Sequence, residues 1–252
     1  MNEYERFKGF SDVYDKSRPM LPREAIEILK KYKDTNIETI VDIGCGTGLS
    51  TLVCNEFSRN VIGIEPSTDM LNEAKKKERD NLKFKQGFGE KTGLSESIAD
   101  IVICVQAFHW MNPEMVLKEV HRILKPNGIF AVINADYPPI INKKLEKIYL
   151  NIVNKAKKME NFSEAIIVNK ERYIDSIRNC KLFDFCREIC FSKAEKYDKD
   201  RFKSFILSHS TVQQAIKNNN INLESLDDVL EGIFQKRTLE AIFPYRMSIG
   251  IK

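Results

Sequence analysis

The sequence predicts an α/β fold with a doubly wound, mostly parallel sheet of seven strands and a helical cap inserted after the fifth strand. Three observations indicate this class. Short runs of β-branched residues alternate with segments of helical periodicity up to residue 135, a glycine-rich turn follows the first run, and the alternation ends at Pro138-Pro139. Strands and helices that alternate at this spacing are joined by right-handed crossovers, which generate a parallel sheet.

The first half of the chain is expected to supply five strands, over residues 38–43, 61–65, 82–86, 100–105 and 129–134. A helix is expected from Pro22 to Tyr32, because proline suits a first helical turn and lysines favour a helix C-terminus. Asn112 followed by Pro113 predicts the start of another helix, since an asparagine side chain can cap free backbone amides. Lys125 to Gly128 is expected to end that helix and to turn the chain.

The pattern changes after Asn134. Residues 141–156 have the periodicity of a long lysine-rich helix, and residues 173–177 predict another. A sixth strand is expected over 185–191 and a seventh over 241–251, with helical segments between them that break at 218–220. We therefore expect one domain over 1–252, divided into an N-terminal arm and helix (1–35), a core (36–135), a helical cap (136–183) and C-terminal strands and helices (184–252).

Composition and charge exclude several classes of protein. The 40 basic and 36 acidic residues give a net charge of +4, and the lysine runs fall on expected helices, where lysines form solvated faces. Nucleic acid is therefore not expected as a partner, because a binding groove would be more basic and would include aromatic residues. No apolar run approaches the roughly 20 residues that span a bilayer, and the polar N-terminus lacks a signal-peptide core. We expect a cytoplasmic protein without a membrane segment.

The six cysteines and three histidines indicate neither a metal site nor a disulfide framework. The cysteines form no C-x-x-C pair, and none of the three histidines lies near a pair of cysteines in the sequence. Cys186 and Cys190 would share one face of the sixth strand as core residues. Reduced, mostly buried thiols are therefore expected.

The glycine-rich turn over residues 41–48 predicts a ligand site at the carboxyl end of the first strand. Its alternate glycines, Gly44, Gly46 and Gly48, remove the side chains that would keep a ligand away from the backbone. A dinucleotide fingerprint would need a third glycine at the position of Leu49, so NAD is disfavoured. Glu65 ends the second strand, where a carboxylate can accept both hydroxyls of a ribose.

The chain resembles the class I S-adenosylmethionine-dependent methyltransferases, in particular the methyltransferase type 11-like branch that includes trans-aconitate methyltransferase-like proteins. The matching stretches lie between about residues 10 and 135 and comprise residues 41–50, 62–67, 87–90, 100–110 and 124–128. The resemblance implies a Rossmann-like methyltransferase fold. It also implies S-adenosyl-L-methionine as the cofactor and S-adenosyl-L-homocysteine as the product.

The same resemblance implies cofactor contacts along the turn and at the ends of the following strands. The implied contacts are Asp42, Gly44, Cys45, Gly46, Gly48, Glu65, Pro66, Met70, Gly89, Glu90 and Gln106. Asp42 would orient the amino group or, alternatively, only stabilise the turn. Glu65 would hold the ribose, with Pro66 and Met70 against the adenine, although Met70 would also suit the core. Gly89 and Glu90 would approach the adenine edge.

The N-terminal arm and the helical cap, from about Tyr137 to Arg172, are expected to close the pocket. Tyr14 and Arg18 resemble the family's N-terminal segment, which folds over the cofactor, so that Arg18 would pair with the carboxylate and Tyr14 with the sulfonium. The alternative is an ordinary surface arm. His109 is a candidate general base, or an orienting residue, and Trp110 would wall the substrate pocket. His209, in the C-terminal region, is a further candidate for substrate contact.

The resemblance implies an enzyme that methylates a small-molecule carboxylate, hydroxyl or amine, as a monomer or a homodimer. Two alternatives remain open: a methyltransferase that acts on RNA or protein, and a non-catalytic module that only binds S-adenosylmethionine. Residues 106–109 lack the proline-rich motif that enzymes methylating nucleic-acid amino groups carry after the fourth strand. Alignment of an activated methyl donor with its acceptor would itself supply much of the rate enhancement.

Overall fold

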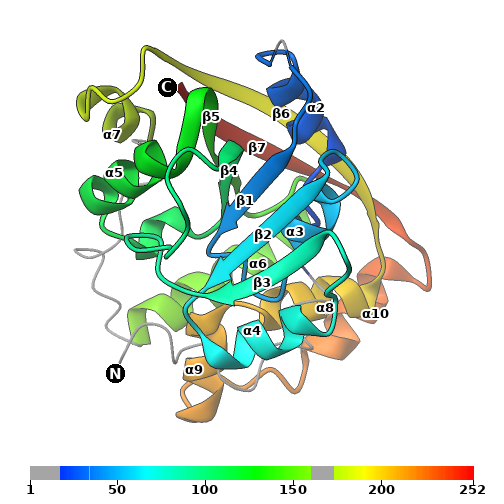
Figure 1. Cartoon of the computed structure of the whole chain (residues 1–252). Helices are drawn as coiled ribbons and strands as arrows, with labels where there is room; N and C mark the ends of the chain where they lie inside the picture. Colours follow the sequence, from blue (N-terminus) through cyan, green and yellow to red (C-terminus); the bar gives the residue numbers. More distant parts are fainter. Residues whose placement is uncertain (1–17, 34, 160–172) are drawn as a thin grey trace.

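The computed structural model of the chain describes residues 18–33, 35–159 and 173–252. These residues form a seven-stranded sheet in the order β3-β2-β1-β4-β5-β7-β6 (Figure 1). The strands are β1 Thr39–Ile43, β2 Asn60–Glu65, β3 Leu82–Gln86, β4 Ala99–Val105, β5 Leu124–Ala135, β6 Phe185–Tyr197 and β7 Leu239–Ile251. Neighbouring strands from β3 through to β5 are parallel, whereas β7 is antiparallel to both β5 and β6. The predicted α/β class and the seven-stranded, Rossmann-like sheet are confirmed.

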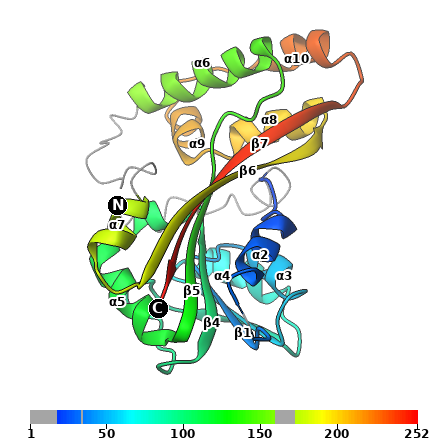
Figure 2. The same ribbon diagram turned by 90° about the horizontal axis from the view of Figure 1, so that it is seen from above.

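Helices cover both faces of the sheet. The central strands are apolar on both sides and are therefore buried on both sides. On one face, Ile40 and Ile101 belong to a core shared with α2, α3 and α4, and on the other Val41 and Val102 pack with α5 and α7 (Figure 2). The bounds of these helices are α2 Arg23–Lys30, α3 Leu49–Cys54, α4 Thr68–Lys75, α5 Pro113–Ile123 and α7 Tyr173–Asn179. The register pairs Val41 with both Ile62 and Val102, so the carboxyl ends of β1, β2 and β4 lie at one edge of the sheet.

A separate helical layer lies beyond the carboxyl ends of the parallel strands (Figure 2). It consists of α6 Lys143–Met159, α8 Lys199–Leu207, α9 Ser210–Lys217 and α10 Leu226–Phe234, and we call it the cap. Only α6 comes from the insertion after the fifth strand, and the other three helices lie between β6 and β7. The predicted cap range of 136–183 also included α7. That helix instead packs against the sheet, because Tyr173 and Ile177 belong to the same buried cluster as Val102 of β4 and Phe130 of β5.

Local details confirm some predictions and correct others. Asn112 caps α5 as predicted, because its side chain accepts a hydrogen bond from the Met115 amide at 3.1 Å. Residues 125–128, predicted as a turn before the fifth strand, lie within β5 as an irregular stretch, where the pairing with β4 shifts register. The core position predicted for Cys190 is wrong. Its side chain is exposed because β6 is the edge strand, and Cys186 is only half-buried.

Two predicted absences can be compared with the described part of the chain. No group of three or more potential metal ligands occurs among the described residues. Among those same residues, no helix has the length and apolar character required to span a membrane. The lysines of α6 are exposed, as expected of a solvated helix face.

Candidate functional site

A pocket lies at the carboxyl ends of β1, β2 and β4, where the glycine-rich turn predicted a ligand site. Its empty volume is about 740 Å³, open solvent included. The residues that line this first pocket are Gly44, Gly46, Glu65, Pro66, Ser67, Met70, Phe88, Gly89, Glu90, Val105, Gln106, Ala107, Trp110 and Met111. Eight residues predicted to contact the cofactor are thereby brought together: Gly44, Gly46, Glu65, Pro66, Met70, Gly89, Glu90 and Gln106.

The glycine turn places bare backbone against this pocket. The amides of Gly44 and Cys45 donate to the Ile64 carbonyl at 2.8 and 3.1 Å, which ties the turn to β2. Gly46 has a φ of +57°, and a β-carbon added there would meet no atom within 4 Å. Gly48 has a packing role, and its predicted contact with the cofactor stays a prediction. It does not line the pocket, and a β-carbon there would lie 2.6 Å from the Phe84 ring, so it serves the packing of α3.

Glu65 holds its carboxylate between the turn and the start of α4. One oxygen accepts the Gly46 amide and the other accepts the Ser67 amide, each at 2.9 Å. The side chain is buried, and this burial raises the pKa of the carboxyl group, while the two amide bonds act in the opposite direction. Each oxygen has a second lone pair. The carboxylate is therefore fixed in place and can still accept hydrogen bonds from a ligand in the pocket.

Asp42 lies beneath the turn rather than on the pocket wall. It is 0% exposed, and its Oδ2 accepts hydrogen bonds from Ser50 Oγ at 2.6 Å and Thr51 Oγ1 at 2.8 Å. Burial raises the pKa of Asp42 to about 6. Among the described residues, nothing donates a hydrogen bond to Oδ1. The contacts account for a turn-stabilising role, and contact with a cofactor amino group stays a prediction.

The far wall of the pocket comes from the segments after β3 and β4. Glu90 accepts the Asn112 amide at 2.8 Å, which joins these two segments. Phe88, which is 46% exposed, and Met111 also line the pocket, and sequence reasoning missed both. Phe88 could have been found, because it directly precedes the predicted contact Gly89. Nothing in the sequence distinguished Met111 from a core methionine.

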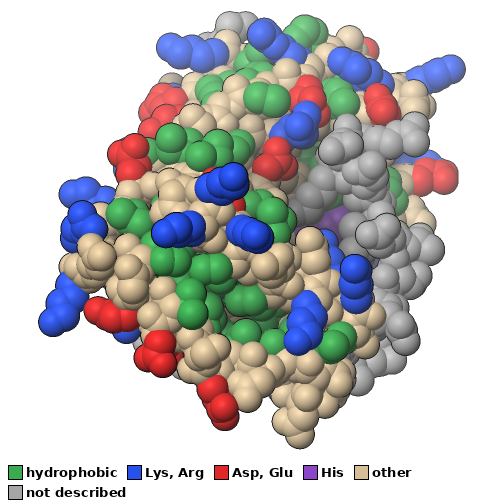
Figure 3. Space-filling view, turned by 180° about the vertical axis from the view of Figure 1, so that it is seen from behind, with side chains coloured by type: hydrophobic (Ala, Val, Ile, Leu, Met, Phe, Trp, Pro, Cys, Tyr) green, Lys and Arg blue, Asp and Glu red, His purple; other side chains and the backbone are tan. Residues whose placement is uncertain are grey.

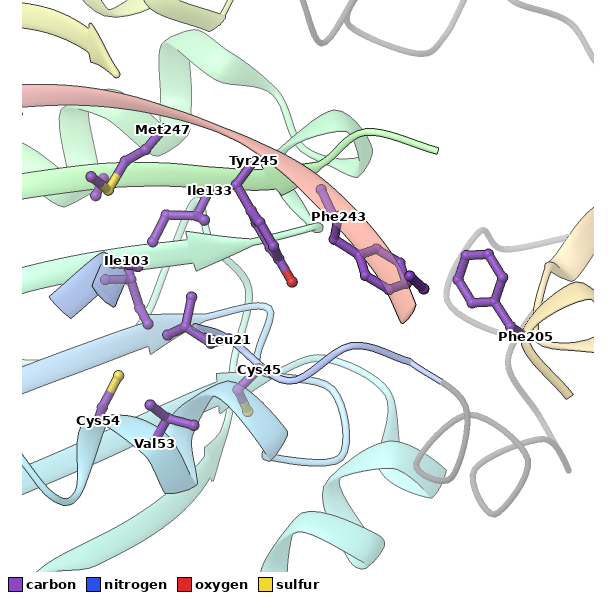
Figure 4. Close-up of a cluster of buried hydrophobic side chains, with 14 of the residues drawn as sticks. Leu21, Cys45, Val53, Cys54, Ile103, Ile133, Phe205, Phe243, Tyr245 and Met247 are labelled. Carbon is purple, nitrogen blue, oxygen red and sulfur yellow. The ribbon is translucent and has the colours of Figure 1, made fainter. Parts of the chain in front are cut away.

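A second pocket of about 560 Å³ adjoins the first over the turn. The two share Gly44, Gly46, Val105 and Gln106 in their linings, and the second also includes Arg18, Cys45, Tyr137 and Tyr245. Tyr245 extends from β7 in the direction of Leu21 and Cys45 (Figure 4). Among the residues that line the second pocket, Arg18 is the one with a formal charge. Tyr14, predicted to act beside it, lies outside the described residues.

Arg18 lines the second pocket together with the glycine turn and also contacts the cap. Its guanidinium donates to the Ser208 carbonyl at 3.1 Å and lies 5.4 Å from the centre of the Tyr137 ring. Gln106 stands where the two pockets meet and donates to the Ala135 carbonyl at 3.1 Å and to the Tyr137 hydroxyl at 3.3 Å. Its φ of +56° is unusual for a residue other than glycine, and such strained backbone is common at functional sites.

The three aromatic candidates lie in different places. Trp110 lines the first pocket, and its predicted contact with the substrate stays a prediction. His109, on the short helix η2 (Phe108–Trp110), is 9% exposed, with its ring centroid 4.7 Å from that of Trp110, and it lines neither pocket. His209 lies in the cap with Nε2 2.9 Å from the Tyr149 hydroxyl. The roles of both histidines stay predictions.

On the face opposite to that of Figure 1, lysine, arginine and acidic side chains are interspersed with apolar ones over the described residues (Figure 3). Over the described residues of this face, the basic side chains do not form the continuous band that binds a phosphate backbone.

Comparison with known proteins relates this site to a family. Residues 41–132 match the family model described as a methyltransferase domain. A protein of Saccharomyces cerevisiae named as a probable S-adenosylmethionine-dependent methyltransferase is 37% identical over 132 residues, which cover 49% of this chain and 45% of that protein. An uncharacterized methyltransferase of Schizosaccharomyces pombe is 33% identical over 129 residues, covering 50% and 51% respectively. The chain thus spans about half the length of the curated relatives it matches.

Solved structures extend the likeness of the fold beyond that segment. A structure from Anaeromyxobacter dehalogenans, provisionally described as a type II methyltransferase, has a TM-score of 0.74 at 19% identity and covers 93% of this chain and 97% of that one. The YcgJ protein of Bacillus subtilis has a TM-score of 0.56 at 18% identity, with coverage of 92% and 99%. At these identities the likeness concerns the fold alone.

The sheet order and the family match identify residues 41–132 as a methyltransferase domain of the class I fold, with the glycine turn after β1 and the Glu65 carboxylate at the end of β2. Over this segment the chain is similar to S-adenosylmethionine-dependent methyltransferases.

Proposed function

We propose that the chain transfers the methyl group of S-adenosylmethionine to a small-molecule acceptor. The observation that carries this proposal is the pair of pockets that meet over Gly44 and Gly46, with a carboxylate in one and a guanidinium in the other. The distribution of charge fits a cofactor with an uncharged, hydroxyl-bearing sugar at one end and a carboxylate at the other. The intermixed surface charges favour a small acceptor over a nucleic acid.

The residues of the pockets divide the work of binding. Glu65 accepts hydrogen bonds from the ribose hydroxyls, and Pro66 and Met70 pack against the adenine. Arg18 binds the cofactor carboxylate through a charge-assisted hydrogen bond, which is stronger than a neutral one. The bare backbone at Gly46 admits the ligand, because a β-carbon there would project into open space. These residues fit the cofactor that the family uses.

The chemistry of transfer requires little from the protein beyond alignment. The bound sulfonium compound supplies an activated methyl group. Gln106, which lines both pockets, and Trp110, which lines the first, orient the acceptor. Alignment of two reactants can lower a barrier by about 7–11 kcal/mol. An ionised carboxylate has no proton to lose, so methylation of such an acceptor requires no dedicated proton acceptor. A hydroxyl or ammonium acceptor would need one, and His109 and His209 are the candidates.

Calorimetric titration with S-adenosylmethionine and S-adenosylhomocysteine tests the proposal. We expect Glu65→Ala to weaken binding of both compounds by about 100-fold, since two hydrogen bonds to a charged group contribute about 1.5–3 kcal/mol each. Glu73→Ala is the matched control, because Glu73 pairs with Lys76 on the exposed face of α4 and should leave binding unchanged. Absence of binding by the unmodified protein, or equal affinities in the two variants, would refute the proposal.

A further inference from the structure

The first pocket has a floor formed by one side chain that fits between two glycines. A β-carbon on Gly89 would lie 2.7 Å from Met111 Sδ, and one on Gly44 would lie 2.9 Å from Met111 Cε. Real β-carbons essentially never approach another atom this closely. The Met111 thioether thus occupies volume that side chains at positions 44 and 89 would otherwise need.

The backbone around Met111 holds the thioether in this place. Met111 directly follows η2, and its amide donates to the Phe108 carbonyl at 3.2 Å. The next amide, that of Asn112, donates to Glu90 Oε1 at 2.8 Å, which fastens the segment to the residue after Gly89. The position of the thioether is therefore set from both sides of the pocket.

Met111 also faces the ligand space and is not simply part of the core. It lines the first pocket and is only partly buried, whereas Ile43 and Val116, the other side chains closest to Gly89, do not line it. A methionine side chain is flexible and polarisable, which suits contact with an aromatic ring. Replacement by alanine would remove Cγ, Sδ and Cε and would leave a hollow connected to the pocket.

We propose that Met111 is a specificity-determining residue that limits the size of the purine accepted by the first pocket, with Gly44 and Gly89 as the small residues that fit against it. This inference rests on the proposed function, because it assigns the purine half of the cofactor to this pocket. It predicts that a smaller residue at position 111 weakens binding of the natural purine and allows a larger purine to bind.

The experiment measures dissociation constants for S-adenosylhomocysteine and for three analogues that carry an added methyl group at C2, N6 or C8 of the purine. For Met111→Ala we expect binding of S-adenosylhomocysteine to weaken three- to tenfold and at least one analogue to gain tenfold or more relative to it. Met115→Ala is the matched control, since Met115 is 54% exposed on α5, and it should leave all four constants unchanged.

A second set of variants tests the fit between the two residues. Gly89→Ala alone should weaken binding of S-adenosylhomocysteine tenfold or more, because the added methyl group meets the thioether. The double variant Gly89→Ala, Met111→Ala should recover most of that loss, and thermal unfolding of each variant reports whether it folds. No gain by any analogue, or no recovery in the double variant, overturns the assignment. Failure of the unmodified protein to bind S-adenosylhomocysteine would instead overturn the proposed function.

Discussion

We call the glycine turn together with Asp42 and Glu65 the turn region. The turn region and the cap are stabilised in different ways. In the turn region, polar contacts join residues close in the sequence, since Asp42 bonds to hydroxyls eight and nine residues away and Glu65 to amides two and nineteen residues away. In the cap, Tyr149 meets His209 across 60 residues, and Arg18 meets Ser208 across 190. The turn region buries two carboxylates, whereas the centre of the cap is aromatic. The two regions should therefore respond to different perturbations.

The comparison with relatives follows the same division. Similarity of sequence to the curated proteins covers about half of the chain, while similarity of fold to a solved structure covers 93% of it. The matched segment, residues 41–132, contains the whole lining of the first pocket. The cap lies outside that segment. Similarity of sequence therefore extends over the first pocket but not over the cap.

The largest expected effect is on the stability of the cap. Phe205 is fully buried and stacks on Tyr149 with ring centroids 5.6 Å apart, and it also packs edge-on against Phe243. We expect Phe205→Ala to lower the free energy of unfolding by about 3–5 kcal/mol, because the cavity cannot close around rigid rings. Urea denaturation measures this loss.

The matched control for this prediction is Phe185→Ala. Phe185 is an exposed phenylalanine on β6, and its removal should cost far less stability. Binding of S-adenosylhomocysteine to Phe205→Ala should weaken by no more than about tenfold, since Phe205 contacts the ligand site through Arg18, 5.8 Å from its ring, and no described residue of the cap lines the first pocket. A loss of affinity as large as the loss of stability would show that the two regions act as one unit.

The next effect concerns pH and belongs to the turn region. Burial raises the pKa of Asp42 from 3.8 to about 6, so the folded protein holds this proton more tightly than the unfolded chain does. Ionisation therefore destabilises the fold. The contribution of Asp42 to the free energy of unfolding is greatest below about pH 4 and falls by at most about 3 kcal/mol as the pH rises past 6.

Asp42→Asn should remove this dependence. The difference in free energy of unfolding between the variant and the unmodified protein should change in favour of the variant as the pH rises from 4 to 7, as measured by urea denaturation at several pH values. Asp100→Asn is the control. Burial alone would raise the pKa of Asp100, but hydrogen bonds from Lys125 and from the amides of Thr39 and Glu38 lower it, so its contribution changes only below about pH 4. If the free energy of unfolding changed with pH in the same way for Asp42→Asn and the unmodified protein, the raised pKa of Asp42 would be contradicted.

The contrast between the regions also explains what could be predicted from the sequence. The glycine turn, the position of Glu65 at a strand end and the Asn112 side chain at the N-terminus of α5 were predictable, because each depends on neighbours within one strand–turn–helix unit. The packing of Gly48 against Phe84 was not predicted because Phe84 lies on a different strand, and spacing alone does not show which glycine faces a ligand. Met111 was missed because its fit against Gly44 and Gly89 depends on three separate strands being brought together.

The composition of the cap was the least predictable part of the fold. Periodicity indicated α6 and the helical pieces after residue 201, but not that they pack on one another. The long β6 and β7 carry α8–α10 to the same side as α6, and their length was underestimated because half-exposed strands lack a continuous apolar run. The Tyr149–His209 contact follows from that packing. Pairings between distant segments of this kind leave no local pattern in the sequence.

The smallest effect tests a polar link between the two regions, the bond from Arg18 to the Ser208 carbonyl. Arg18→Met should weaken binding of S-adenosylhomocysteine about tenfold, through loss of one charge-assisted hydrogen bond to the carboxylate, as measured by calorimetry. Binding of 5′-methylthioadenosine, which lacks the amino-acid part, should be unchanged, whereas Glu65→Ala should weaken binding of both compounds. Arg23→Met is the control, because Arg23 pairs with Glu56 on the exposed side of α2. Equal weakening of both compounds by Arg18→Met would mean that Arg18 acts by holding Ser208 and the cap in place. Arg18 would then belong to the cap as a structural residue and not to the binding site.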